Sequence, residues 1–158
     1  MNSATLLWER KCGCDPFQGS RKWFAGPATD REEPMPPKRI LLVDDEQLVR
    51  ESISRWLLQD GHAVVEANNG AEAFALFLGG QFDLVMTDFE IPFVKGNELA
   101  ARIKRVAPGQ PILMITGYGK RPGPGNPVDA VLNKPFNRDQ LRSALEKLFA
   151  RVGASFPA

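Results

Sequence analysis

Phe-Asp-Leu-Val-Met-Thr-Asp, residues 82–88, is an apolar run that ends in an acidic side chain. Three other short apolar runs also lead to polar residues: 40–43 to Asp44 and Asp45, 112–115 to Thr116, and 130–133 to Lys134. Such runs are typical of the buried strands of a parallel sheet. Because the carboxyl ends of these strands face one crevice, the sequence predicts a site with three carboxylates, one hydroxyl and one ammonium. This set suits a divalent cation and a phosphoryl group.

Helical and extended patterns alternate along the chain from Lys38 onward. The expected strands are residues 39–43, 62–67, 82–87, 111–115 and 130–133. The expected helices are residues 46–58, 71–78, 96–106 and a last one from about 137 to 153. At the start of the last helix, Asn137 and Gln140 form a predicted capping box. This order of elements predicts an α/β fold with a doubly wound, five-stranded parallel sheet.

A further helix would be expected between Thr116 and Lys134, but residues 117–127 read Gly-Tyr-Gly-Lys-Arg-Pro-Gly-Pro-Gly-Asn-Pro. Proline denies a helix one of its backbone hydrogen bonds, and glycine weakens a helix because it loses much backbone entropy there. We therefore expect a loop in place of a helix in this segment.

The composition of the chain bounds its class. Its 158 residues fit one domain with a short extension. The formal net charge of +1 gives no bias toward nucleic acid. No apolar run approaches the roughly 18 residues that a membrane-spanning helix needs, and the start of the chain lacks the pattern of a secretory signal. The sequence predicts a cytoplasmic protein without nucleic acid or membrane partners.

The first part of the chain, residues 1–37, differs from the rest and is expected to be a linker-like or disordered extension. Within it, Cys12 and Cys14 are predicted to be free thiols, because they have neither the spacing of a redox pair nor enough neighbouring metal ligands. We expect residues 1–34 to be dispensable for folding, and Met35 is a plausible alternative start. The domain itself is expected over residues 38–152, and residues 153–158 form a short tail.

The ordered motifs resemble the receiver domain of bacterial two-component response regulators over about residues 38–151. The matching segments are Leu42–Glu46, Asp88 with Pro92 and Gly96, Thr116 with Gly117, and Lys134 with Pro135 and Phe136. The resemblance implies a flavodoxin-like sheet in the order 2-1-3-4-5. The Gly- and Pro-rich loop is similar to that of a minority of receivers that lack a regular fourth helix.

The resemblance also implies roles for single residues. Asp88 would be the phosphoacceptor, forming an aspartyl phosphate. Thr116 would donate a hydrogen bond to a phosphoryl oxygen, and Lys134 would place an ammonium beside the phosphoryl group. The Lys134–Pro135 peptide bond is expected to be cis.

The implied cofactor is Mg²⁺, which prefers oxygen ligands and keeps several waters. Asp45 and Asp88 would bind the ion directly, Asp44 through a water, and Glu90 through its backbone carbonyl. The alternative for Asp44 and Asp45 is a pair that caps the following helix, and the two roles are compatible.

The chain departs from the family pattern at Val131, where receivers usually have the tyrosine or phenylalanine that moves with the Thr116 position. Tyr118 is a candidate substitute for that ring, and the alternative is a surface tyrosine in a mobile loop. His62 lies at the start of the second strand, away from the crevice, and no catalytic role is expected for it.

The leading interpretation is a phosphoacceptor without an attached output domain. It would take its phosphoryl group from a phosphohistidine on a histidine kinase or a histidine phosphotransfer protein and would signal by binding another protein. It would not be an enzyme beyond self-phosphorylation and slow autodephosphorylation. An alternative is the receiver segment of a hybrid sensor histidine kinase. Another class is a phosphohydrolase with an aspartate nucleophile, but such enzymes usually have an aspartate where this chain has Glu90. The intact set of site residues argues against a degenerate scaffold.

Overall fold

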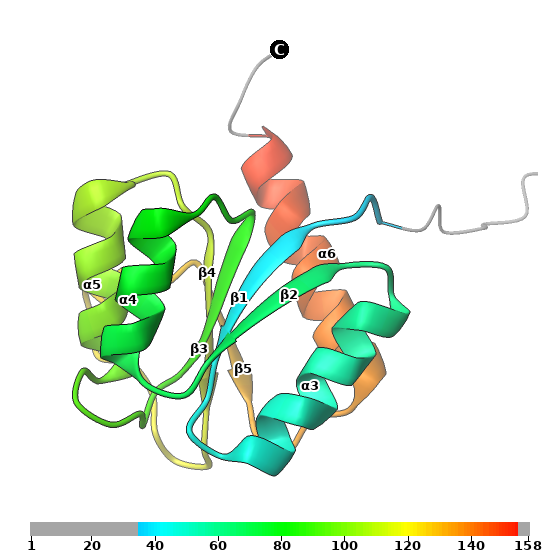
Figure 1. The fold of residues 1–158 in the computed structure, drawn as a ribbon. Coiled ribbons are helices and arrows are strands. Elements are labelled where there is room, and N and C mark those ends of the chain that lie inside the picture. The colour runs from blue at the N-terminus through cyan, green and yellow to red at the C-terminus, as the bar shows by residue number, and fades with distance from the viewer. Residues whose placement is uncertain (1–34, 155–158) are drawn as a thin grey trace, which may run out of the picture. The chain divides into compact units, whose positions relative to one another are not determined.

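A parallel sheet in the order β2-β1-β3-β4-β5 organises residues 35–154, which are the residues that the computed structural model describes (Figure 1). Its strands are β1 Arg39–Val43, β2 Ala63–Ala67, β3 Leu84–Asp88, β4 Ile112–Thr116 and β5 Ala130–Asn133. The helices are α3 Gln47–Gln59, α4 Gly70–Gly79, α5 Gly96–Val106 and α6 Arg138–Ala154. The predicted fold class and strand order are confirmed. The predicted extension up to residue 34, with Cys12 and Cys14, lies outside the described residues.

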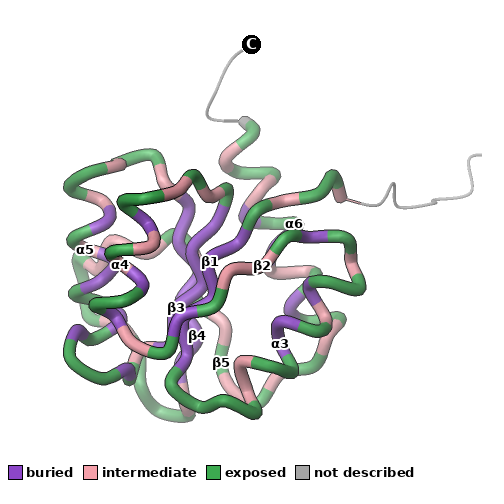
Figure 2. Tube along the Cα trace, in the orientation of Figure 1, coloured by how far each residue is buried: buried purple, intermediate pink, exposed green. Residues whose placement is uncertain are grey.

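The sheet separates two apolar cores because successive side chains of a strand point to opposite faces. Ile40 and Leu42 pack with buried residues of α3 and α6. Leu41 and Val43 pack with buried residues of α4 and α5. Figure 1 shows these two pairs of helices on either side of the sheet, and in Figure 2 the central strands form the buried interior. Within residues 35–154, no helix is long and apolar enough to cross a lipid bilayer.

Side-chain caps fix the starts of two helices. Asn137 accepts a hydrogen bond from the Gln140 N–H at 2.9 Å, and the Gln140 side chain accepts one from the Asn137 N–H at 2.9 Å. This exchange confirms the predicted capping box. Asn69 accepts in the same way from the Glu72 N–H at 2.8 Å and begins α4.

Five strand boundaries differ from the prediction, and the ends of β3 and β4 are the two that matter for the site. β3 and β4 also begin later than expected, at Leu84 and Ile112. Asp88 and Thr116 are the last residues of β3 and β4, where we expected them to follow the strands. The reason is the register, which pairs Asp88 with Ile115 and Thr116 with Asn133. β2 begins at Ala63, one residue later than expected, because the His62 N–H donates to the Leu57 carbonyl at the end of α3.

Residues 117–129 form no helix and contain two tight turns. Gly119 and Gly125 have φ angles of 79° and 85°, values that favour glycine. The segment is anchored at its end, where the Asp129 carboxylate accepts from the Ile112 N–H and from the Lys104 ammonium, both at 2.8 Å. No helix therefore covers Val131 from this segment, and its side chain is 40% exposed.

Candidate functional site

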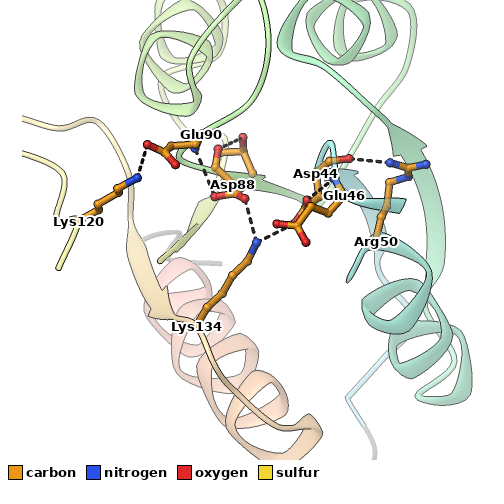
Figure 3. A network of polar contacts seen from close by, with 8 residues as sticks. Asp44, Glu46, Arg50, Asp88, Glu90, Lys120 and Lys134 are labelled. Atoms are coloured by element: carbon orange, nitrogen blue, oxygen red, sulfur yellow. Dashed lines mark hydrogen bonds and ion pairs between the residues drawn. The ribbon is translucent and has the colours of Figure 1, made fainter. Parts of the chain in front are cut away.

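The predicted crevice lies at the carboxyl edge of the sheet, and Figure 3 shows how its charged side chains meet. Asp44 follows β1, Asp88 ends β3 and Lys134 follows β5. These three side chains converge although they are far apart in the chain, because parallel strands bring their carboxyl ends to the same edge. Asp44 and Asp88 are buried, and the Lys134 side chain is 23% exposed.

Lys134 bridges the two buried carboxylates. Its ammonium donates to Asp88 Oδ2 at 2.9 Å and to Asp44 Oδ2 at 3.2 Å. Burial by itself lowers the pKa of Lys134, but the hydrogen bond to Asp88 and the two negative charges outweigh it and raise the pKa. Lys134 is therefore a permanent cation of the site. The Lys134–Pro135 peptide bond is cis, as the resemblance implied.

Asp44 is fixed by contacts of its main chain as well as its side chain. Its N–H donates to the Ala67 carbonyl at 3.2 Å, and its Oδ1 accepts the Glu46 N–H at 2.9 Å. The N-cap of α3 is Glu46, without a side-chain cap, so the interpretation of Asp44 and Asp45 as the helix cap is wrong. Burial raises the pKa of Asp44 above its usual value, against the lowering effects of the Glu46 N–H and Lys134.

Arg50, which the sequence analysis missed, braces the loop that holds Asp44. Its Nη1 donates to the Asp44 carbonyl oxygen at 2.7 Å, and its Nε donates to the Glu66 carboxylate at 3.1 Å. The guanidinium thus links β2 to the acidic loop. In the sequence, the only indication that Arg50 could contact the Asp44 loop is its position one turn into α3.

The carboxylates of Asp44, Asp45 and Asp88 can place one oxygen each within 4.8 Å of one another. Asp45 is exposed while the other two are buried, so the cluster has a wall of protein and an open side. A set of carboxylate oxygens with access to water fits Mg²⁺, which binds one or two carboxylates and keeps several waters. The residues present therefore fit the implied cation.

The backbone of Glu90 contacts Asp88, while the Glu90 side chain points away from Asp88. The Glu90 N–H donates to Asp88 Oδ1 at 3.3 Å. The Glu90 carboxylate pairs with the ammonium of Lys120, which comes from the loop after β4 (Figure 3). A hydrogen bond from Lys120 and its charge lower the pKa of Glu90. This carboxylate is therefore ill-suited to the acid role that an aspartate-nucleophile phosphohydrolase needs.

Thr116 is fully buried at the end of β4, and its hydroxyl donates to Asn133 Oδ1 at 3.0 Å. Its carbonyl oxygen accepts the Lys134 N–H at 2.7 Å. The structure therefore brings Thr116 to the same edge as Asp88 and Lys134, and it adds Asn133, which the sequence analysis did not single out. The feature that could have identified Asn133 is its position opposite Thr116 in the neighbouring strand.

Gly96 shapes the backbone of the acceptor aspartate. A Cβ at this position would lie 2.1 Å from the backbone oxygen of Asp88 and 3.0 Å from the Cα of Phe89. Real Cβ atoms do not come within 2.1 Å of a non-bonded heavy atom, so only glycine lets the start of α5 approach β3 this closely.

The remaining predicted residues lie away from the acidic cluster. Tyr118 is 97% exposed in the loop after β4. His62 is buried before β2, at the opposite edge of the sheet, and its Nδ1 accepts the Lys38 N–H at 3.2 Å. That contact gives His62 a structural role.

Comparison with known proteins places this geometry in context. The family model of the response regulator receiver domain matches residues 40–146. The transcriptional regulatory protein TcrA of Mycobacterium tuberculosis is 36% identical over 117 residues, which are 72% of this chain and 46% of that protein. The response regulator receiver protein CpdR of Brucella abortus is 36% identical over 115 residues, 70% of this chain and 96% of that protein. The chain thus spans about half the length of TcrA and nearly all of CpdR.

Solved structures show the same similarity. The response regulator protein TrrA from Thermotoga maritima, solved in complex with Mg²⁺ and BeF, is 35% identical and aligns with a TM-score of 0.67. The alignment covers 70% of this chain and 98% of that one. Its fold is that of residues 35–154 here.

Proposed function

This chain belongs to the response regulator receiver domain family of two-component systems, and on that basis we propose that it accepts a phosphoryl group from a phosphohistidine onto Asp88. The donor is a histidine kinase or a histidine phosphotransfer protein. The observation on which the proposal depends most is the contact of the Lys134 ammonium with Asp88 Oδ2 at 2.9 Å, beside a cluster of carboxylates. A nucleophile, a fixed cation and a cation-binding set therefore occupy one crevice.

The residues divide the chemistry as follows. Asp88 attacks the phosphorus through one carboxylate oxygen, and the imidazole of the donor leaves with the electron pair of the broken P–N bond. Lys134 balances the negative charge that the phosphoryl group brings into the crevice. Phosphoryl transfer asks little of a protein beyond alignment and charge neutralisation. The hydrogen bonds from the Lys134 ammonium and the Glu90 N–H orient the Asp88 carboxylate.

Mg²⁺ would be held by Asp45 and Asp88 directly, by Asp44 through a water, and by the backbone carbonyl of Glu90. When bound, the ion offsets the repulsion between an anionic nucleophile and an anionic phosphoryl group. Arg50 and Glu46 keep Asp44 in place for this role through the contacts described above. TrrA, which was solved in complex with Mg²⁺ and BeF, supports a cation site in this fold.

A phosphorylation assay tests the proposal. The protein is incubated with Mg²⁺ and acetyl phosphate, a small phosphoryl donor, and intact mass is measured before and after. We expect one phosphoryl group per chain, lost in Asp88→Asn and absent when a chelator removes Mg²⁺. Asp83→Asn is the matched control, since Asp83 is exposed on the opposite edge of the sheet and should leave the modification unchanged. A phosphoryl group that persists in Asp88→Asn would overturn the assignment.

A further inference from the structure

The hydroxyl of Thr116 has a hydrogen-bond acceptor within the protein itself. It donates to Asn133 Oδ1 at 3.0 Å, across the β4–β5 pair in which these two residues are in register. The Thr116 carbonyl also accepts the N–H of Lys134, the residue that follows β5. The hydroxyl and the carbonyl oxygen of Thr116 are therefore both hydrogen-bonded to residues at the end of β5.

A threonine hydroxyl has one proton to donate. Under the proposed function that proton is needed by a phosphoryl oxygen on Asp88, and in the structure it is given to Asn133. The two acceptors therefore compete for one donor. Thr116 is fully buried, which leaves water little access to serve as a third partner.

We propose that Asn133 is a positioning residue that holds the Thr116 hydroxyl in the resting protein and yields it to the phosphoryl group. The inference rests on the proposed function, because the exchange has a purpose only if Asp88 accepts a phosphoryl group. When the hydroxyl turns away, the exposed Asn133 carboxamide takes water as its partner. Phosphorylation of Asp88 would thereby break a hydrogen bond between β4 and β5.

This route fits the other residues of β5. The side chain of Val131 has no polar atom, and the residue is 40% exposed. It stands where receivers usually have an aromatic ring. Asn133 lies two residues further along the same strand and on the same face, because alternate residues of a strand point the same way. The hydrogen bond to the Asn133 side chain therefore couples Thr116 to β5 in a chain that lacks the aromatic ring.

A double-mutant cycle tests the exchange. The affinity for beryllofluoride, a mimic of the phosphoryl group, is measured by calorimetry at saturating Mg²⁺ for four proteins: the natural chain, Asn133→Ala, Thr116→Val and the double variant. Removing the competing acceptor should tighten binding about two- to tenfold in Asn133→Ala, the effect of one net hydrogen bond. In the Thr116→Val background the same substitution should have no effect. Val131→Ala is the control on β5, with no expected change.

Weaker or unchanged binding in Asn133→Ala would overturn the inference, as would an equal gain in the Thr116→Val background. Urea unfolding of each variant shows that it is folded, and the amide signals of Asn133 in nuclear magnetic resonance spectra give a second readout. The side-chain amide signals should shift on addition of beryllofluoride in the natural chain and shift less in Thr116→Val. If the natural chain binds no beryllofluoride, the proposed function itself fails, and the inference with it.

Discussion

The ammonium of Lys134 lies 2.9 Å from Asp88 Oδ2, although the two residues are 46 positions apart in the chain. The same ammonium also contacts the buried Asp44, so one cation lies between two carboxylates. Removing one of these three charged groups leaves an uncompensated charge in a largely buried site, which destabilises the fold.

The first prediction follows from this balance. Lys134→Ala leaves Asp44 and Asp88 without their cation and should lower the free energy of unfolding by about 1–3 kcal/mol at neutral pH. Mg²⁺ should stabilise this variant more than it stabilises the natural chain, since a metal ion then meets no competing ammonium. Urea unfolding with and without Mg²⁺ measures both effects.

Lys120→Ala is the control, because Lys120 pairs with the exposed Glu90, and exposed ion pairs contribute little to stability. Equal Mg²⁺ stabilisation of Lys134→Ala and the natural chain would contradict the prediction.

The second prediction concerns Gly96. Gly96→Ala forces a Cβ to within 2.1 Å of the Asp88 backbone oxygen unless that backbone moves. We expect a loss of about 1–3 kcal/mol of unfolding free energy and a clear loss of beryllofluoride affinity, because the displaced residue is the acceptor. Gly109→Ala, whose Cβ would meet nothing within 4 Å, is the matched variant and should retain both. If Gly96→Ala retained its stability and its beryllofluoride affinity as Gly109→Ala does, α5 and β3 would be able to separate without cost.

The third prediction is a pH dependence due to His62, the one histidine of the chain. Burial lowers the pKa of His62 from its ordinary value of 6.5, with Asp60 opposing and Lys38 adding to the effect. As the pH falls below 6.5, the unfolded chain gains a proton that the folded chain excludes, so stability should fall. Each pH unit in that window is worth at most about 1.4 kcal/mol.

His62→Asn offers Lys38 an oxygen in place of Nδ1 and should be less dependent on pH between 5 and 7. Parallel slopes for the variant and the natural chain in urea unfolding would argue that another group titrates.

The fourth prediction concerns residues 117–129. Within this segment, local turns hold the backbone at Lys120 and Asn126 through hydrogen bonds of 3.3 and 3.2 Å. Contacts of Thr116 and Lys134 with a phosphoryl mimic should restrict its conformations. We expect hydrogen exchange of these amides to slow when Mg²⁺ and beryllofluoride are added, while the amides of α4 stay unchanged. Equal exchange rates in both forms would mean that the signal leaves by another face.

Much of the site could be predicted because it depends on periodicity. The apolar run that ends in Asp88 identifies a buried strand, and the run before Lys134 identifies a partly exposed strand at the side of the sheet. Parallel strands bring their ends together whatever the details of packing. Likewise, the capping box at Asn137 needs only two residues of the same turn. Such features are local in the chain, so a pattern in the sequence is enough to find them.

Contacts between side chains on different elements could not be predicted in the same way. Asp60 accepts from Arg138 and Arg142, and it is 78 positions from the first and 82 from the second. Many arginines could pair with that carboxylate on sequence alone. Only the approach of α6 to the end of α3 selects these two.

The sequence by itself determined the sheet, its order of elements and the identity of the acidic and basic groups at its edge, because hydrophobic period and turn residues dictate them. The tertiary structure alone decided which acceptor takes the proton of Thr116 and which carboxylate pairs with Lys120. It also decided that Arg50 braces the loop of Asp44. A hydrogen bond requires its atoms to meet within about 3 Å, and that closeness is a property of the packed chain.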